Sequence, residues 1–260
     1  MSYKGVIYFD LDGTLLDRDS QLSEENRQVL HQLHQKGYLS VIASGRSPKE
    51  IREVTRNTPI NSYVALNGQY VRAADQVLCA NAIATDHIRE LLDLSSSLGH
   101  PVASYGESDY RINFVNEATT KLYQLDNAPL PQVDPDFHLQ QDIYMLYLFS
   151  EAAELDSSYE QAFQGKLSFF RDSPFSLAFV NHGVSKKTGI ERMNDYLTLD
   201  STQNTYAFGD GGNDIQMLQC VAHPIAMGNA SDQVKAHAEF VTRSNTDGGI
   251  AHALKHYGIL

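Results

Sequence analysis

Short apolar runs alternate with stretches of helical periodicity over the first 60 residues. Run 5–9 has the length and the β-branched and aromatic content of a buried strand, and run 38–43 has the same character. Between them, Ser23 is a typical N-cap residue before an apolar helical face that Gly37 ends. A second helix is expected after Ser47, where serine, proline and glutamate form a capping box. This alternation predicts a parallel sheet with crossover helices.

The pattern changes over residues 82–182, where expected strands come in adjacent pairs and most of the aromatic residues lie. From 183 the chain returns to alternating helix and strand, with a helix from Lys186 and a strand over 205–208. We therefore predict an α/β protein with a Rossmann-like, doubly wound parallel sheet core, built from 1–81 and 183–260. An α+β domain, 82–182, is inserted into that core.

A hairpin is expected where strands 63–66 and 69–71 flank Asn67-Gly68. Asn-Gly suits the positive φ angles of a two-residue type I′ turn. Asn67 could also reach into a site and contact substrate, although turn chemistry alone explains its presence.

Composition and charge narrow the possible partners. The 260 residues include 32 acidic and 20 basic ones, a formal charge of −12, which argues against a nucleic-acid-binding surface or an anionic membrane partner. No apolar run approaches the ~18 residues that a membrane-spanning helix needs. Two cysteines cannot form a disulfide framework, and no charged-then-apolar leader opens the chain. A cytoplasmic protein is expected.

Polar clusters follow three of the expected strands. Asp10 and Asp12 come directly after run 5–9, Ser44-Gly45-Arg46 after run 38–43, and the acidic segment 210–214 after strand 205–208. A surface turn explains any one cluster. Ligands of parallel α/β sheets, however, bind beyond the carboxyl ends of the strands, so neighbouring strands would bring the three clusters together. Several carboxylates in one place are unfavourable without a cation, and their oxygens suit Mg²⁺.

Four segments carry a family resemblance. They are DLDGTLL at 10–16, Ser-Gly-Arg at 44–46, Gly-Val-Ser-Lys at 183–186 and GDGGNDIQML at 209–218. In order and spacing they resemble the four motifs of the haloacid dehalogenase-like (HAD) phosphohydrolases, particularly the Cof-type sugar-phosphatase-like branch. In that branch a substrate-covering cap of type II lies between the second and third motifs, which corresponds to 82–182 here.

The resemblance implies roles for the acidic residues. Asp10 is expected to be the nucleophile that forms an aspartyl-phosphate. Asp12 is expected to protonate the leaving alcohol and then to activate water. Asp210 is expected to bind Mg²⁺ with Asp10 and the backbone carbonyl of Asp12, and Asp214 to support the metal or to orient the lysine.

The resemblance also implies a phosphate-binding set, in which Ser44, Gly45 and Asn213 hold phosphoryl oxygens and Lys186 neutralises their charge. Serine stands at 44 where the family often has threonine, and Lys187 stands where glycine is common. Either lysine could in principle bind phosphate, and the match of Val-Ser-Lys favours Lys186. Arg46 fits a substrate contact and a structural ion pair equally well.

The expected function is a Mg²⁺-dependent phosphatase acting on a small phosphorylated metabolite, with a sugar phosphate as the expected class. A phosphomutase or phosphotransferase of the same superfamily is the alternative. A non-catalytic phospho-ligand sensor is disfavoured, because such a protein would be expected to have lost one of Asp10, Asp12, Lys186 or Asp210. The sequence leaves the oligomeric state and the substrate-selecting residues open. Four polar or amphipathic residues lie near expected strand ends of the insert: Tyr105, Glu107, Arg111 and Asn113. They could line a substrate pocket, and a half-exposed antiparallel sheet would produce the same pattern.

Overall fold

The computed structural model describes residues 3–125, 129–198 and 203–260. These residues form two compact units, one comprising Met1–Cys79 with Ser185–Leu260 and the other Ala80–Val184. The sequence placed the boundaries of the insert at 82 and 182, and the structure divides the chain at 80 and 184.

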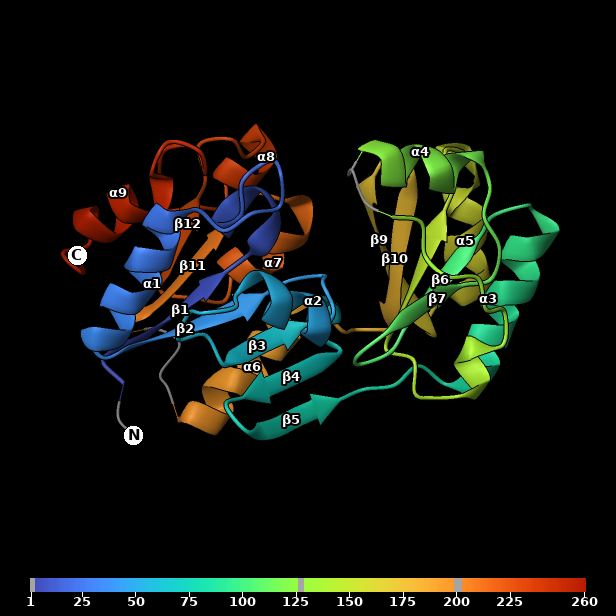
Figure 1. Cartoon of the computed structure of the whole chain (residues 1–260), viewed down its shortest axis with the longest axis horizontal. Helices are drawn as coiled ribbons and strands as arrows, with labels where there is room; N and C mark the ends of the chain where they lie inside the picture. The colour runs from blue at the N-terminus through green and yellow to red at the C-terminus, as the bar shows by residue number, and fades with distance from the viewer. Residues whose placement is uncertain (1–2, 126–128, 199–202) are drawn as a thin grey trace. The chain divides into compact units, whose positions relative to one another are not determined.

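An eight-stranded sheet forms the middle of the first unit, in the order β13-β12-β11-β1-β2-β3-β4-β5 (Figure 1). The pairs from β13 to β3 are parallel, and β4 runs antiparallel to β3. The strands are β1 Gly5–Phe9, β2 Tyr38–Ala43, β3 Ser62–Ala65, β4 Tyr70–Ala73, β5 Gln76–Ala80, β11 Thr205–Gly209, β12 His223–Ala226 and β13 Phe240–Val241. The predicted parallel α/β core is confirmed.

Helices cover both faces of this sheet. They are α1 Glu24–Gln35, α2 Pro48–Val54, α6 Lys186–Leu197, α7 Ile215–Leu218, α8 Asp232–Lys235 and α9 Gly249–His256. Val6 and Tyr8 of β1 pack with α6, α7 and α8 in one buried cluster. Because side chains alternate along a strand, Ile7 and Phe9 point to the other face, where α1 lies against β2 and beside α9.

The predicted helix starts are present. The Ser23 hydroxyl accepts a hydrogen bond from the Asn26 backbone N–H at 3.1 Å, and Gly37 ends the turn after α1 with φ +86°. Ser47 and Glu50 form the expected capping box at α2. Each cap satisfies backbone N–H groups that the first helical turn leaves without a partner.

The prediction of a two-residue turn at Asn67-Gly68 is wrong. Ala65 pairs with Tyr70, so four residues connect β3 and β4. Both Leu66 and Asn67 have positive φ angles, and the Leu66 carbonyl accepts a hydrogen bond from the Gln69 N–H at 3.2 Å. The tight turn that Asn-Gly signals is therefore built into a longer connection whose backbone also hydrogen-bonds to Ser44 and Arg46.

The second unit is an antiparallel sheet with helices, in the order β7-β6-β8-β10-β9. Its elements are α3 Thr85–Ser97, β6 Val102–Tyr105, β7 Tyr110–Ile112, α4 Glu117–Leu125, β8 Met145–Phe149, α5 Asp156–Phe163, β9 Leu167–Ser173 and β10 Ser176–Asn181. Apolar residues of α3 and α5 pack on the sheet in one buried cluster. Asn113 accepts hydrogen bonds from the Val102 and Phe114 N–H groups, and Arg111 pairs with Asp109. These contacts favour the structural interpretation of Arg111 and Asn113.

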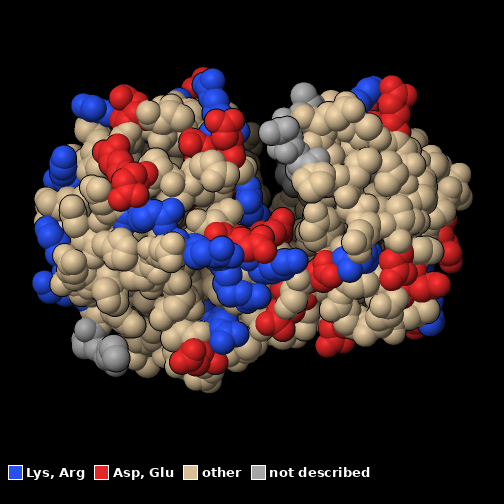
Figure 2. Space-filling view, in the orientation of Figure 1, with Lys and Arg blue, Asp and Glu red and all other residues tan. Residues whose placement is uncertain are grey.

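Acidic and basic side chains are mixed at the surface. On the face drawn in Figure 2, the Lys and Arg side chains of the first unit stand beside Asp and Glu, and the second unit presents a broad area of uncharged side chains. Cys79 and Cys220 are free and partly buried. Among the described helices, none is long and apolar enough to cross a membrane.

Candidate active site

The turn 10–16 begins where β1 ends. The Asp10 N–H donates to the Phe208 carbonyl of neighbouring β11 at 3.0 Å, and the Leu16 N–H donates back to the Leu11 carbonyl at 2.8 Å. Non-helical angles at Asp12 and Gly13 interrupt this turn, and Gly13 has φ +78°. A Cβ at Gly13 would collide with the Asp210 carboxylate. Glycine therefore permits both the backbone conformation and the close approach of Asp210.

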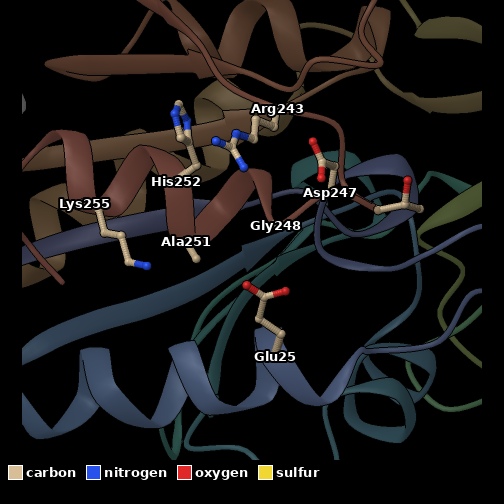
Figure 3. A pocket seen from close by; sticks show the side chains of 8 residues that line it. Glu25, Arg243, Asp247, Gly248, Ala251, His252 and Lys255 are labelled. Carbon is tan, nitrogen blue, oxygen red and sulfur yellow. The ribbon is translucent and has the colours of Figure 1, made fainter.

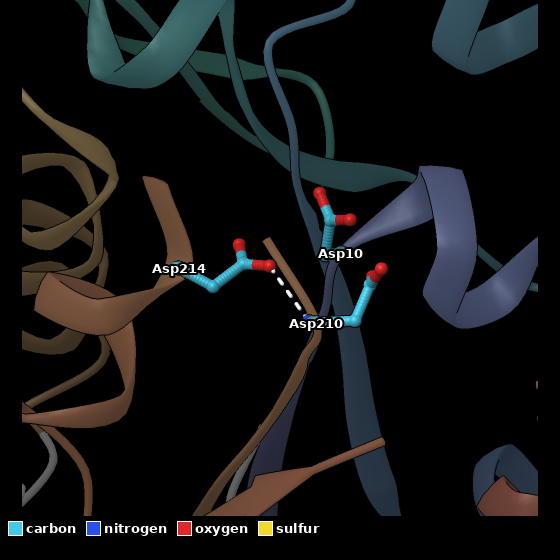
Figure 4. Close-up of side chains that lie close together, drawn as sticks. All are labelled: Asp10, Asp210 and Asp214. Carbon is cyan, nitrogen blue, oxygen red and sulfur yellow. Dashed lines mark hydrogen bonds between the residues drawn. The ribbon is translucent and has the colours of Figure 1, made fainter. Parts of the chain in front are cut away.

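Three carboxylates meet at the carboxyl ends of β1 and β11. Oxygen atoms of Asp10, Asp210 and Asp214 all lie within 4.8 Å of one another, although 200 residues separate the first aspartate from the second (Figure 4). The Asp214 Oδ2 accepts hydrogen bonds from the backbone N–H groups of Asp210 and Gly211 at 3.0 and 2.9 Å. The Thr14 hydroxyl donates to Asp210 Oδ1 at 2.7 Å. The convergence expected from the strand ends is thus present for these three aspartates.

Lys186 supplies a positive charge to this cluster. Its Nζ lies 2.6 Å from both Asp10 Oδ1 and Asp214 Oδ1, and its side chain is 1% exposed. Lys186 is the first residue of α6, whose N-terminus is held by a capping box between Ser185 and Thr188. Lys187, the alternative lysine, is 44% exposed and pairs with Glu191. The structure therefore places Lys186, and not Lys187, at the carboxylates.

Burial and like charge oppose ionisation of the cluster. Burial, followed by the charge of Asp214, raises the pKa of Asp10 well above its ordinary value, against the opposing effect of Lys186. Burial likewise raises the pKa of Asp210 to about 6. Burial would lower the pKa of Lys186, but the charges of Asp10 and Asp214 outweigh it and raise that pKa. One ammonium group therefore leaves negative charge at the site only partly balanced.

The donor set fits a hard divalent cation. Asp10 uses one oxygen for Lys186, and Asp210 accepts one side-chain donor at each oxygen, Thr14 at Oδ1 and Asn229 at Oδ2. Each of these oxygens keeps a second lone pair for a cation. Asp214 uses Oδ1 for Lys186 and Oδ2 for two backbone N–H groups. Asp10 and Asp210 are thus the carboxylates best disposed to hold a cation, and Asp214 is the best disposed to hold the lysine.

Asp12 is not part of the group of three carboxylates; it is largely exposed and pairs with Arg46. Its side chain is 53% exposed and accepts two hydrogen bonds from the Arg46 guanidinium, at 2.8 Å from Nε and 2.5 Å from a terminal nitrogen. Arg46 also donates to the Ser20 hydroxyl at 2.9 Å. The structure therefore shows the ion pair that was one of the two interpretations of Arg46.

The remaining predicted residues lie on the β2 and β11 sides of the site. The Ser44 hydroxyl is buried and accepts from the Arg46 N–H at 3.1 Å. A Cβ at Gly45 would meet the buried Asn67 amide at 3.4 Å. The Asn213 amide donates to Asn67 Oδ1 at 3.4 Å. Asn67 thus connects the segment after β2 to the segment after β11.

Sequence reasoning missed Asn229 and Asn245. Asn229 follows the strand β12 and donates from Nδ2 to the Gly13 carbonyl at 2.8 Å and to Asp210 Oδ2 at 3.3 Å. Asn245 Nδ2 donates to the Leu16 carbonyl at 2.8 Å. The only available signal was positional, because Asn229 closely follows the strand β12.

Comparison with known proteins gives a consistent relationship over nearly the whole chain. The model of the haloacid dehalogenase-like hydrolases matches residues 7–254. A putative phosphatase of Bacillus subtilis, YkrA, is 33% identical over 262 residues, which cover 98% of each chain.

Solved structures of related phosphatases have the same fold. The phosphatase BT1666 from Bacteroides thetaiotaomicron superposes with a TM-score of 0.90 at 27% identity, covering 99% of this chain and 96% of that one. The sugar phosphatase BT4131, of HAD subclass IIB, superposes with a TM-score of 0.87 at 26% identity, covering 99% and 100%. The prediction made from the four motifs is confirmed: the chain belongs to the haloacid dehalogenase-like hydrolases.

Proposed function

We propose that this protein is a Mg²⁺-dependent phosphatase that hydrolyses a small phosphorylated metabolite, most simply a sugar phosphate, through an aspartyl-phosphate on Asp10. The observation that carries the proposal is the set of contacts of Lys186, which holds the Asp10 carboxylate at a strand end, two residues before a second, exposed aspartate. Relatives named as phosphatases, and a similar structure described as a sugar phosphatase, support the substrate class.

In the first half of the reaction Asp10 attacks phosphorus and the ester oxygen leaves with the alcohol. Asp12, the exposed carboxyl group of the turn 10–16, is the proposed donor of the proton to that oxygen. An alkoxide is a poor leaving group, so a proton donor at this point matters most for alkyl phosphates. Asp12 requires freedom from Arg46 to do this, and its exposure on the edge of the site permits such movement.

In the second half a water molecule hydrolyses the aspartyl-phosphate, and Asp12, now a carboxylate, accepts the proton of that water. Release of inorganic phosphate restores the free Asp10 carboxylate. Dividing one displacement into two lets a single carboxylate pair serve first as nucleophile and acid, and then as leaving group and base.

Charge on the phosphoryl oxygens is balanced by groups around Asp10. We propose that Lys186, the Ser44 hydroxyl, the Gly45 N–H and Asn213 hold these oxygens, and that Asp214 orients Lys186. Asp10, Asp210 and the Asp12 carbonyl are the proposed ligands of Mg²⁺. When bound, Mg²⁺ offsets the charge of the carboxylates and of the incoming phosphate.

The test is hydrolysis of a panel of phosphorylated metabolites, with release of inorganic phosphate as the measurement. Activity that requires MgCl₂, disappears with EDTA and is lost in Asp10→Asn supports the proposal. Full activity in Asp10→Asn contradicts it. Isomerisation of hexose phosphates without phosphate release would instead support the phosphomutase alternative.

A further inference from the structure

We propose that Asn229 is a positioning residue for the metal site: it holds the Asp210 carboxylate against the turn 10–16 and thereby sets the affinity of the site for Mg²⁺. The inference rests on the proposed use of Mg²⁺ and concerns a residue outside the four motifs. Asn229 follows β12, whose continuation is fixed to β11 by the hydrogen bond from the Met227 N–H to the Gly209 carbonyl at 3.0 Å.

Asn229 touches both parts of the proposed metal site. Its Nδ2 lies 2.8 Å from the Gly13 carbonyl and 3.3 Å from Asp210 Oδ2. The other Asp210 oxygen, Oδ1, accepts from Thr14 at 2.7 Å. Each oxygen of Asp210 thus has its own donor, which fixes the rotation of the carboxylate about its Cβ–Cγ bond.

The orientation of the Asn229 amide follows from its partners. Its Oδ1 faces the Asn245 backbone N–H at 3.0 Å, and a backbone N–H can only donate. Its Nδ2 faces the Gly13 carbonyl, which can only accept. A flipped amide would lose both hydrogen bonds, so a donor is directed at Asp210.

The segment 243–248 supports Asn229 from behind. Gly228 brings the chain so close to this segment that a Cβ would lie 2.7 Å from the Ser244 nitrogen. The Gly228 N–H donates to the Arg243 carbonyl at 2.9 Å, and the Gly249 N–H to the Ser244 carbonyl at 3.2 Å. This backbone packing fixes the position of the Asn245 N–H that donates to Asn229.

The same segment also reaches the far end of the turn 10–16. Asn245 Nδ2 donates to the Leu16 carbonyl at 2.8 Å, so Asn229 and Asn245 hold the carbonyl groups of Gly13 and Leu16. On its outer side the segment borders a hollow of about 440 Å³, which Glu25, Arg243, His252 and Lys255 line between α1 and α9 (Figure 3). One face of the segment 243–248 therefore holds Asn229 and the turn 10–16, while its other face is open to solvent.

A donor directed at a metal-ligating carboxylate orients the ligand, and removing such a partner typically weakens metal binding by about 10–100-fold. Asn229 is itself exposed. Its replacement removes the partners of the Gly13 carbonyl and the Asn245 N–H, but neither residue is buried, so water can take the place of the amide and the effect on folding is expected to be small.

The experiment compares Asn229→Ala with the wild type and with Gln233→Ala, a control on α8 whose side chain is likewise exposed. The Mg²⁺ dissociation constant is taken from the rise of the melting temperature with MgCl₂ concentration, starting from protein in EDTA. In Asn229→Ala this constant is expected to rise about tenfold. The melting temperature in EDTA is expected to stay within about 2 °C of the wild type, and Gln233→Ala should match the wild type in both.

Three results overturn the inference. An unchanged Mg²⁺ dissociation constant in Asn229→Ala removes the positioning role while leaving the proposed phosphatase intact. A fall of the melting temperature in EDTA by more than about 5 °C shows a structural role instead. A wild-type protein whose melting temperature does not respond to Mg²⁺ removes the metal site itself, and with it this inference.

Discussion

Lys186 Nζ lies 2.6 Å from the Asp214 carboxylate, and both side chains are almost completely buried. Asp214 also accepts two backbone N–H groups, so its position is fixed independently of the lysine. The ammonium group is therefore held beside Asp10 from two directions, by the start of α6 and by Asp214. A charge held in this way is preorganised.

Replacing Lys186 by methionine should lower kcat/KM by about 10²–10³-fold, because a preorganised charge is lost where the phosphoryl group develops its transition-state charge. Lys187→Met is the matched control, since Lys187 is exposed and pairs with Glu191 outside the site. Steady-state hydrolysis in saturating MgCl₂ measures kcat/KM of both variants, and circular dichroism verifies that they are folded. Equal losses in the two variants would contradict the assignment of Lys186.

Replacing Asp12 by asparagine should separate the two halves of the reaction. With p-nitrophenyl phosphate, whose leaving group is acidic, the first step needs little proton donation. The second step still lacks its base. We expect a rapid burst of about one p-nitrophenolate per active site followed by slow turnover, measured by stopped-flow absorbance. A variant with no burst and normal steady-state turnover would exclude Asp12 as the base.

Gly13→Ala should damage both stability and activity. The residue has φ +78°, and a Cβ would collide with Asp210, so strain of about 1–3 kcal/mol is expected. Gly212→Ala is the control, because a Cβ there meets nothing within 4 Å. Thermal unfolding and phosphate release measure the two effects. Identical melting temperatures for the two variants would show that the turn 10–16 tolerates a side chain.

The second unit should lose stability in mild acid. Burial, followed by the charge of Arg171, lowers the pKa of His100 below 6.5, its ordinary value. His100 is held by Tyr159 at 2.7 Å and Ser150 at 3.1 Å, with Asp156 and Arg171 nearby. A lowered folded-state pKa means that this contribution is present above pH 6.5 and is lost as the pH falls through the folded value.

The measurement is the melting temperature of wild type and His100→Gln between pH 7.5 and 5, a range from about one unit above to about 1.5 units below the ordinary histidine pKa. The wild type should lose stability more steeply toward pH 5 than the variant, because glutamine does not titrate. Parallel pH profiles would show that other groups govern the acid sensitivity of the protein.

Much of the fold could be predicted from the sequence because local and long-range signals agree. Apolar runs with caps on either side gave β1, β2 and the helices between them, and the strand-end rule brought Asp10 near Asp210 without any knowledge of contacts. The length of the connection at Asn67 could not be predicted in this way. It is set by hydrogen bonds to the segment after β2, which is a tertiary context.

Asn229 and Asn245 illustrate what single-sequence reasoning cannot reach. Asparagine after a strand is an ordinary turn residue, and nothing local distinguishes one whose amide meets Gly13 and Asp210. Whether Arg46 contacts substrate or forms an ion pair likewise could not be decided without the position of Asp12 in space. The catalytic and binding roles assigned to these residues stay predictions until the variants above are measured.

The proposed chemistry depends on four neighbouring strands, β12, β11, β1 and β2, ending at nearly the same level. One residue of strand spans about 3.3 Å and reverses the side to which the next side chain points. Deleting a single residue within β11 would withdraw Asp210 by roughly that distance and turn it to the opposite face of the sheet. A change of strand length would therefore disturb the site of this enzyme more than a substitution inside a strand.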